Sequence, residues 1–162
     1  MACLKKLHIL FVCEDNGLAV HTPTSVRRGY KSIIDIISKF DCYTFESDST
    51  DVLKIHDIAL QAKECAYEQG PVFMNLKYYR YLEHVGINED FDAGYRPIKE
   101  FEEWYNKDPI KIQRSRLTNI GINESVIKEI EKDIDNKISE SISRAKNAPL
   151  SNNKEAYKDV FI

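Results

Sequence analysis

Apolar residues along the chain fall into short runs typical of strands and longer stretches with the period of a helix. The strand-like runs cover about residues 7–13, 41–46 and 71–79. The helical stretches cover about residues 30–40, 52–69, 98–106 and 109–119, and a long segment that follows Asn123. Strands that alternate with helices predict an α/β fold, in which a parallel sheet has flanking helices and a helical C-terminal region follows it.

Residues 81–97 interrupt this pattern, because they show no periodicity and include two glycines. A connection of this length inside a compact domain is usually functional or disordered. The ends of the neighbouring helices are better marked: Gly70 is placed to end one helix, and Asp108 and Asn123 are placed to cap two others. We expect residues 1–162 to form a single domain, with residues 81–97 as a long loop.

Composition narrows the possible functions and partners. The chain has 162 residues, of which 43% are hydrophobic, and its net charge of -3 gives no argument for a nucleic-acid or membrane surface. No apolar run approaches the length of a membrane span. Its four cysteines lack any CxxC spacing, and three of them occur in apolar patterns. We expect them to be reduced core thiols, and we expect the protein to be cytoplasmic.

The first strand ends at a turn that offers oxygen ligands. Asn16 carries a neutral amide oxygen, Gly17 allows a close backbone approach, and Leu18 contributes a carbonyl two residues on. Oxygen ligands of this kind suit Mg²⁺ or Ca²⁺ bound together with a phosphate. A turn of this composition is more often an ordinary connection. The residues alone leave both alternatives open.

Two neighbouring features have simpler explanations. Glu14 and Asp15 are adjacent acids at the end of a strand, and we expect them to be solvated. Arg27 and Arg28 could bind a phosphate, but together with Lys31 they are more typical of an exposed basic face.

The segment 13–18, Cys-Glu-Asp-Asn-Gly-Leu, resembles the end of the thiamine-diphosphate motif in one family. The family comprises alpha subunits of the first, decarboxylating component of 2-oxo acid dehydrogenase complexes. The resemblance implies that Asn16, through its side chain, and Leu18, through its carbonyl, bind Mg²⁺ and with it the cofactor. The opening Gly-Asp-Gly of the motif, with its aspartate ligand, is not in the sequence, and residues 1–6 resemble the last turns of the helix that joins the two halves.

A second match covers Tyr79-Arg80-Tyr81-Leu82-Glu83-His84 and Tyr95-Arg96. The resemblance implies that His84 contacts the diphosphate end of the cofactor and takes part in proton transfer, as an imidazole can near neutral pH. Without that context, His84 would be an ordinary solvated loop residue. Arg80 and Arg96 match the arginines that hold the loop in place.

The loop also departs from the family. Val85 stands where mitochondrial members have the serine that a regulatory kinase modifies, and Leu82 and Glu83 replace His and Gly. The stretch from His84 to Tyr95 is about two residues longer than in those members. Substrate and regulation are therefore not carried over from them. Further similarity lies in residues 101–110, with their Asp-Pro-Ile turn, and in residues 157–161.

Taken over the whole chain, the resemblance implies the C-terminal part of a partial thiamine-diphosphate-binding fold. The expected function is a share in oxidative decarboxylation of a 2-oxo acid and acyl transfer to lipoamide, with thiamine diphosphate and Mg²⁺ as cofactors. The expected partner is the beta subunit of the same dehydrogenase, in a homo- or hetero-oligomer such as a heterotetramer. The fragment alone is expected to be inactive. The alternatives are an acetoin-type dehydrogenase subunit, or a truncated binding or assembly module without catalysis.

Overall fold

The computed structural model describes residues 1–158 of the chain. Contacts divide the chain into two compact units, Met1–Ser115 and Arg116–Ile162. The first unit carries the sheet and the long loop, and the second is helical. The expectation of a single domain stays a prediction, and each unit is described by itself below.

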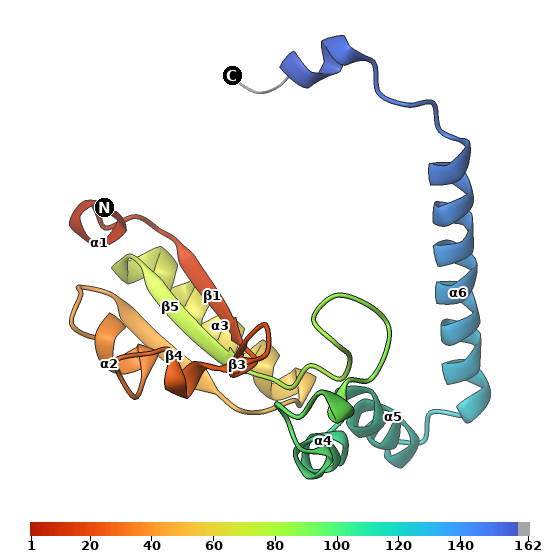
Figure 1. Ribbon diagram of the computed structural model, residues 1–162, viewed down its shortest axis with the longest axis horizontal. Coiled ribbons are helices and arrows are strands. Elements are labelled where there is room, and N and C mark those ends of the chain that lie inside the picture. Colours follow the sequence, from red (N-terminus) through yellow and green to blue (C-terminus); the bar gives the residue numbers. More distant parts are fainter. Residues whose placement is uncertain (159–162) are drawn as a thin grey trace. The chain divides into compact units, whose positions relative to one another are not determined.

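The first unit is built on a sheet of three parallel strands (Figure 1). The strands are β1 (Leu10–Asp15), β4 (Tyr43–Ser47) and β5 (Val72–Lys77), in the order β1-β5-β4. β5 lies in the centre, and its first residue, Val72, is in register with Leu10 on one side and Tyr43 on the other. This arrangement confirms the parallel sheet that the alternating pattern predicts.

Helix α3 (Val52–Gln69) packs on one face of the sheet and forms the core with it. Ala62 and Val72 are fully buried, and Ala66 and Met74 nearly so. Alanines on this face of the helix allow its backbone to approach the strands closely. The helix has the predicted bounds: the Asp51 carboxylate accepts the Leu53 N–H (3.0 Å) at its start, and Gly70, with a φ of 114°, ends it.

Two elements near the first strand differ from the expectation. β1 continues through Glu14 and Asp15, because its pairing with β5 extends to Asp15 opposite Lys77. The helix expected at 30–40 is reduced to α2 (Ile33–Ile37), since the Ser32 hydroxyl accepts the Asp35 N–H (3.3 Å) and so sets the first turn.

A small hairpin follows the turn at the end of β1. It consists of β2 (Leu18–Ala19) and β3 (Thr22–Pro23), which pair antiparallel, and a 3₁₀ turn, η1 (Thr24–Val26). The sequence predicts an extended Thr22 before Pro23 but not the pairing, because Val20 in the turn has a φ of 61°, a conformation that β-branched residues rarely adopt. A single helical turn, α1 (Ala2–Lys5), precedes β1, in agreement with the helical end expected there.

The long loop after β5 leads to two helices, α4 (Ile98–Tyr105) and α5 (Pro109–Asn119). The loop contains one 3₁₀ turn, η2 (Phe91–Ala93). Asp108 caps α5 as predicted, because its carboxylate accepts the Lys111 N–H (2.9 Å). Aromatic rings from the loop pack against α4, with Phe101 5.0 Å from Phe91 and 5.6 Å from Tyr81 between ring centroids.

The second unit contains helix α6 (Glu124–Asn147) and a 3₁₀ turn, η3 (Asn153–Tyr157). The Asn123 side chain accepts the Ser125 N–H (2.9 Å) and caps α6 as predicted. Ile127 is the buried residue of the helix, whereas the other apolar residues that recur along it at helical spacing are about half exposed: Val126, Ile130, Ile134, Ile138 and Ile142. Residues 159–161 of the matched C-terminal segment lie outside the described part of the chain.

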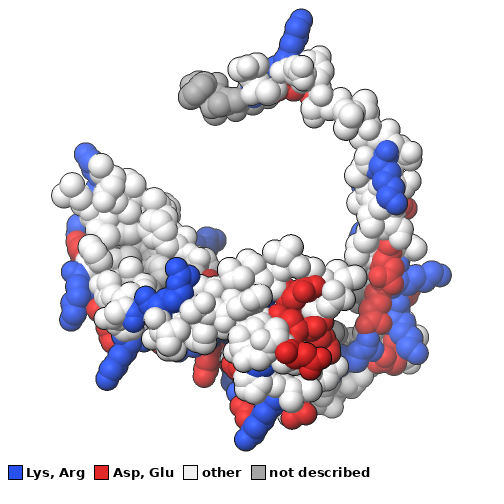
Figure 2. All heavy atoms as spheres, viewed as in Figure 1, with Lys and Arg blue, Asp and Glu red and all other residues white. Residues whose placement is uncertain are grey.

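Many large apolar side chains are exposed on the described residues. Phe11 and Val12 of β1 are 43% and 50% exposed, although they lie in a parallel sheet whose strands are usually covered on both faces. On the visible side, a broad area of the sheet-bearing unit has no charged side chain (Figure 2). No helix in residues 1–158 is long and apolar enough to cross a membrane.

The packing of β5 against α3 gives a first prediction. Val72→Ala removes two methyl groups from a fully buried site, so we expect the free energy of unfolding to fall by about 2 kcal/mol. Val12→Ala is the matched control, because Val12 lies on the edge strand opposite Met74 and is half exposed. Chemical denaturation would measure both, and equal losses for the two variants would contradict the assignment of the core.

Candidate functional site

The carboxyl ends of β1 and β5 lie side by side. In the parallel register, Asp15 is the partner of Lys77, and the Tyr78 N–H continues the ladder to the Asp15 carbonyl (3.2 Å). The turn after β1 and the loop after β5 therefore leave the sheet at the same edge. In open α/β sheets, ligands bind at this edge.

The turn after β1 is held by its own side chains. The Asn16 amide oxygen accepts the Leu18 N–H (2.9 Å), and the Asp15 carboxylate accepts the Gly17 N–H (3.0 Å). Gly17 has a φ of 72°, which explains the glycine, and its carbonyl accepts the Thr24 N–H (2.9 Å). Asn16 is thus fixed at the edge of the sheet before any ligand arrives.

Asp15 is not the solvated acid that the sequence predicts. Its carboxylate accepts a hydrogen bond from Arg28 (3.1 Å), and both side chains are mostly buried. Burial by itself would raise the pKa of Asp15, but the Gly17 N–H and the Arg28 guanidinium together hold that pKa below its usual value. Arg28 is therefore an ion-pair partner rather than part of an open basic face.

A cavity of about 120 Å³ lies between the turn and the loop. It is lined by Asn16, Gly17, Leu18, Pro23, Tyr79, Arg80, Tyr95, Arg96 and Glu100. The structure thus brings the two expected metal-binding residues, Asn16 and Leu18, into one cavity with the two expected loop arginines. Nε and Nη1 of Arg80 and the Tyr79 hydroxyl are buried and have no hydrogen-bond partner in the described residues.

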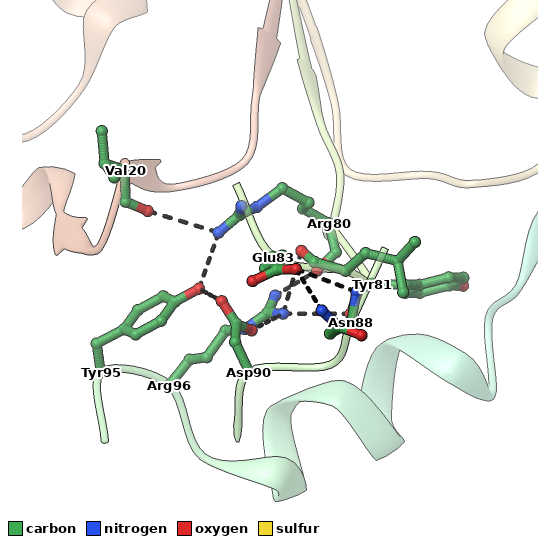
Figure 3. Close-up of polar contacts among 9 residues, drawn as sticks. Val20, Arg80, Tyr81, Glu83, Asn88, Asp90, Tyr95 and Arg96 are labelled. Atoms are coloured by element: carbon green, nitrogen blue, oxygen red, sulfur yellow. Dashed lines mark hydrogen bonds and ion pairs between the residues drawn. The ribbon is translucent and has the colours of Figure 1, made fainter. Parts of the chain in front are cut away.

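Arg96 holds the first residues of the loop. The residue is buried (3% exposed), and its guanidinium donates to the carbonyls of Arg80, Tyr81 (3.2 Å) and Leu82 (3.2 Å). It also forms an ion pair with Asp90, to which its Nε donates at 2.8 Å (Figure 3). One side chain therefore connects two parts of the loop that are distant along the chain.

Arg80 and Tyr95 extend this network to the hairpin. The Tyr95 hydroxyl donates to the second oxygen of Asp90 and accepts from Nη2 of Arg80 (2.9 Å), which also reaches the Val20 carbonyl (3.5 Å). The His21 ring stacks on Tyr95 with 4.5 Å between centroids. Both arginines thus hold the loop, in agreement with the expectation.

The same network sets the ionisation of Asp90. Its burial would raise the pKa, but the hydrogen bonds from Tyr95 and Arg96, with the positive charge of Arg96, keep the pKa of Asp90 below its usual value. A second buried acid connects the loop to α5: Tyr81 donates to Asp108 (2.9 Å). Burial and this bond raise the pKa of Tyr81 to about 12.

His84 lies apart from the cavity. Its side chain is exposed, is not among the lining residues, and has no hydrogen-bond partner in the described residues. The structure therefore does not bring His84 together with Asn16 and Leu18, and the expected contact with a cofactor stays a prediction.

The donor set fits an anionic ligand better than a bare metal ion. In residues 1–158, no group of three or more His, Cys, Asp or Glu side chains could hold a metal. The Asn16 amide oxygen and the Leu18 carbonyl are neutral, whereas Mg²⁺ in proteins usually has one or two carboxylates together with phosphate oxygens. The positive charge of Arg80, which lines the cavity, suits an anion such as a phosphate.

Asp90 and His21 belong to this network but are not among the residues that the sequence motifs single out. Asp90 lies in the aperiodic loop, where no spacing signals a partner, and His21 meets Tyr95 only through the hairpin turn. A buried arginine requires an acid, so the match at Arg96 could have prompted a search for a carboxylate in residues 81–97.

The chain was compared with known protein families. The dehydrogenase E1 component family matches residues 1–154. The chain belongs to this family. The match includes the turn after β1, the loop after β5, and helices α4 to α6.

Individual relatives are similar over the whole chain. The pyruvate dehydrogenase E1 component subunit alpha of Zymomonas mobilis is 27% identical over 164 residues, which is 100% of this chain and 46% of the relative. The same subunit of Rickettsia bellii is also 27% identical, over 100% of this chain and 49% of the relative. The mitochondrial 2-oxoisovalerate dehydrogenase subunit alpha of Caenorhabditis elegans is 28% identical, over 99% of this chain and 37% of the relative. The chain spans about half the length of these relatives, or less.

The buried ion pair of the loop gives a second prediction. Asp90→Asn leaves the Arg96 charge buried without a counterion, which costs about 3 kcal/mol or more. We expect limited proteolysis to cleave residues 80–96 at least about tenfold faster than in the wild type at neutral pH. Asp92→Asn, at an exposed acid of the same loop, is the matched control and should change little.

The difference in cleavage rate between Asp90→Asn and the wild type should shrink as the pH falls. Because the folded state depresses the pKa of Asp90, its contribution is complete above the unfolded value and is lost as pH falls through the folded one. Wild type and Asp90→Asn should therefore converge only in acid, below about pH 4. A difference that grows on acidification would contradict the ion pair.

Proposed function

We propose that this E1-family chain is part of a thiamine-diphosphate-dependent 2-oxo acid dehydrogenase, in which it holds the diphosphate end of the cofactor. The observation that carries the proposal is the cavity in which the Asn16 turn meets Arg80 and Arg96. The names of the relatives support the reaction class, since they are pyruvate and 2-oxoisovalerate dehydrogenase alpha subunits.

Asn16 and Leu18 are the residues of this chain that would bind Mg²⁺, through the side-chain oxygen and the backbone carbonyl. The Asn16 oxygen already accepts the Leu18 N–H, and it retains a second lone pair for a metal. The phosphates of the cofactor would supply the negative charge that these two neutral ligands lack. Arg80 lines the same cavity, and its guanidinium is the positive group that would attract the phosphates.

When bound, thiamine diphosphate supplies the electron sink for decarboxylation of the 2-oxo acid. The role of this chain is to bind the diphosphate end and to carry a proton. We assign the proton carrier to His84, whose exposed imidazole lies on the loop that the Arg96 network anchors. The acyl group would pass to lipoamide on a separate component.

The expected partner is a beta subunit, and the chain alone is proposed to be inactive. The exposed apolar residues of β1 support a covering partner, because a parallel sheet is normally buried on both faces. The four cysteines are free, in agreement with a reducing compartment such as the cytoplasm. Exposed apolar surface equally supports the alternative of a non-catalytic assembly module, and an acetoin-type subunit would share the same cofactor site.

A full-length alpha subunit that contains this chain, mixed with the beta subunit, a 2-oxo acid, thiamine diphosphate and Mg²⁺, separates these alternatives. Asn16→Ala should raise the thiamine diphosphate concentration needed for half-maximal activity by at least about tenfold, because a metal ligand is lost. Asn16→Asp is the matched control, since it retains the acceptor for Leu18 and adds a charge that suits Mg²⁺. A pair without cofactor-dependent activity would favour the assembly module.

His84→Ala should affect turnover rather than the cofactor requirement, in contrast to Asn16→Ala. We expect turnover to fall by about 10²–10⁴-fold at saturating cofactor, because general acid–base catalysis typically contributes this factor, while the half-saturating concentration changes little. His56→Ala, at an exposed histidine of α3, is the matched control. Wild-type turnover of His84→Ala at every pH tested would show that His84 is only a loop residue.

A further inference from the structure

The loop after β5 has a second point of closure, separate from the Arg96 network. The Glu83 N–H donates to the Asn88 carbonyl (2.9 Å). The Glu83 carboxylate oxygen Oε1 accepts the Asn88 N–H (3.2 Å) and the Asn88 side-chain amide (2.9 Å) (Figure 3). These three hydrogen bonds, which we call the Glu83–Asn88 clasp, close the four residues 84–87 into a small loop.

Gly86 shows how closely the clasp fits this small loop. Its φ is 139°, a conformation that side chains disfavour. A Cβ at this position would overlap Oε1 of Glu83 and would lie 2.7 Å from its Cδ and 3.1 Å from its Cγ. The carboxylate therefore passes directly beside the backbone of residue 86, and the clasp requires a glycine there.

The clasp fixes the backbone of residues 83–88 but buries no apolar core. Val85 and Ile87, inside the closed segment, are 83% and 86% exposed. The side chain of Arg96 binds residues 80–82 and Asp90 and forms no hydrogen bond to Glu83 or Asn88. Removal of the clasp should therefore leave the rest of the first unit folded.

His84 is the residue whose position depends on this order. It directly follows Glu83, and its exposed ring has no hydrogen-bond partner in the described residues. With no hydrogen bond of its own, the ring takes its place from the backbone of residues 83–88. A proton carrier on a mobile segment would lose conformational entropy each time it was ordered for catalysis. In a closed loop this entropy is already lost when the chain folds.

We propose that Glu83 is a positioning residue for His84, and that the Glu83–Asn88 clasp holds the His84 segment in order before a cofactor or substrate binds. This inference rests on the proposed function only in giving His84 a proton to carry. The order itself is a property of the chain, so it can be tested without catalysis.

The first experiment uses the 162-residue chain without ligands. Hydrogen exchange of the Glu83 and Asn88 amides reports the clasp, and ¹³C-histidine labelling reports the four imidazoles, with His84→Ala assigning the relevant signal. Glu83→Ala removes the acceptor, Gly86→Ala forces the carboxylate away with Glu83 and Asn88 both present, and Glu83→Gln retains an acceptor. Glu89→Ala, at an exposed neighbouring acid, is the matched control.

We expect Glu83→Ala and Gly86→Ala to speed exchange of the Asn88 amide by about tenfold, because charge-assisted hydrogen bonds are lost. Both should shift the His84 signal while leaving the other three histidine signals in place. Glu83→Gln should restore most of the protection, and Glu89→Ala should match the wild type. Unchanged exchange and an unchanged His84 signal in both disrupting variants would overturn the proposal.

The second experiment uses a full-length alpha subunit that contains this chain, paired with its beta subunit. Glu83→Ala should lower kcat and leave the half-saturating thiamine diphosphate concentration unchanged, with Glu83→Gln restoring kcat. A wild-type kcat in Glu83→Ala would overturn the positioning role even if the clasp is confirmed. Wild-type pairs without 2-oxo acid activity would instead refute the proposed function, and the exchange and ¹³C results would then decide the structural claim alone.

Discussion

The buried guanidinium of Arg96 is the interaction on which the candidate site depends. An arginine removed from water needs partners for its charge and for its N–H groups, and here Asp90 supplies the charge while three successive carbonyls of residues 80–82 accept hydrogen bonds. Backbone carbonyls in an irregular segment have no hydrogen-bond partners from a helix or a sheet. The Arg96 N–H groups supply those partners, and the carbonyls in turn satisfy the buried N–H groups. The result is an ordered loop without regular secondary structure, located where β5 ends.

This order continues through contacts between side chains. Asp90 accepts from both Arg96 and Tyr95, Tyr95 accepts from Arg80, and His21 stacks on the Tyr95 ring. The turn after β1 and the loop after β5 thus share one network, although about 60 residues separate Val20 from Arg80. Arg80 lines the cavity between them, and its positive charge is the feature that favours an anionic ligand.

The sheet is buried on its α3 side but exposes apolar residues of β1. β5 and α3 form a small core of alanine, valine and methionine side chains, while β1 exposes phenylalanine and valine. A partner that covers β1 would complete the burial that a parallel sheet normally has. The relatives are named as alpha subunits, and they are about twice as long as this chain or more.

The sequence by itself determined the local structure wherever a residue type has one strong preference. The bounds of α3, the caps at Asp108 and Asn123, and the alternation of strands and helices follow from helical period and side-chain capping, which act within a few residues. Motif matches also singled out Asn16, Arg80 and Arg96. Only the tertiary structure decided that β1 continues to Asp15, because pairing with β5 overrides the turn signal in Glu14-Asp15-Asn16. It alone decided the partners of Arg96 and the closure of Glu83 on Asn88, since the contacts of an aperiodic loop depend on where the chain returns in space and not on any spacing along it.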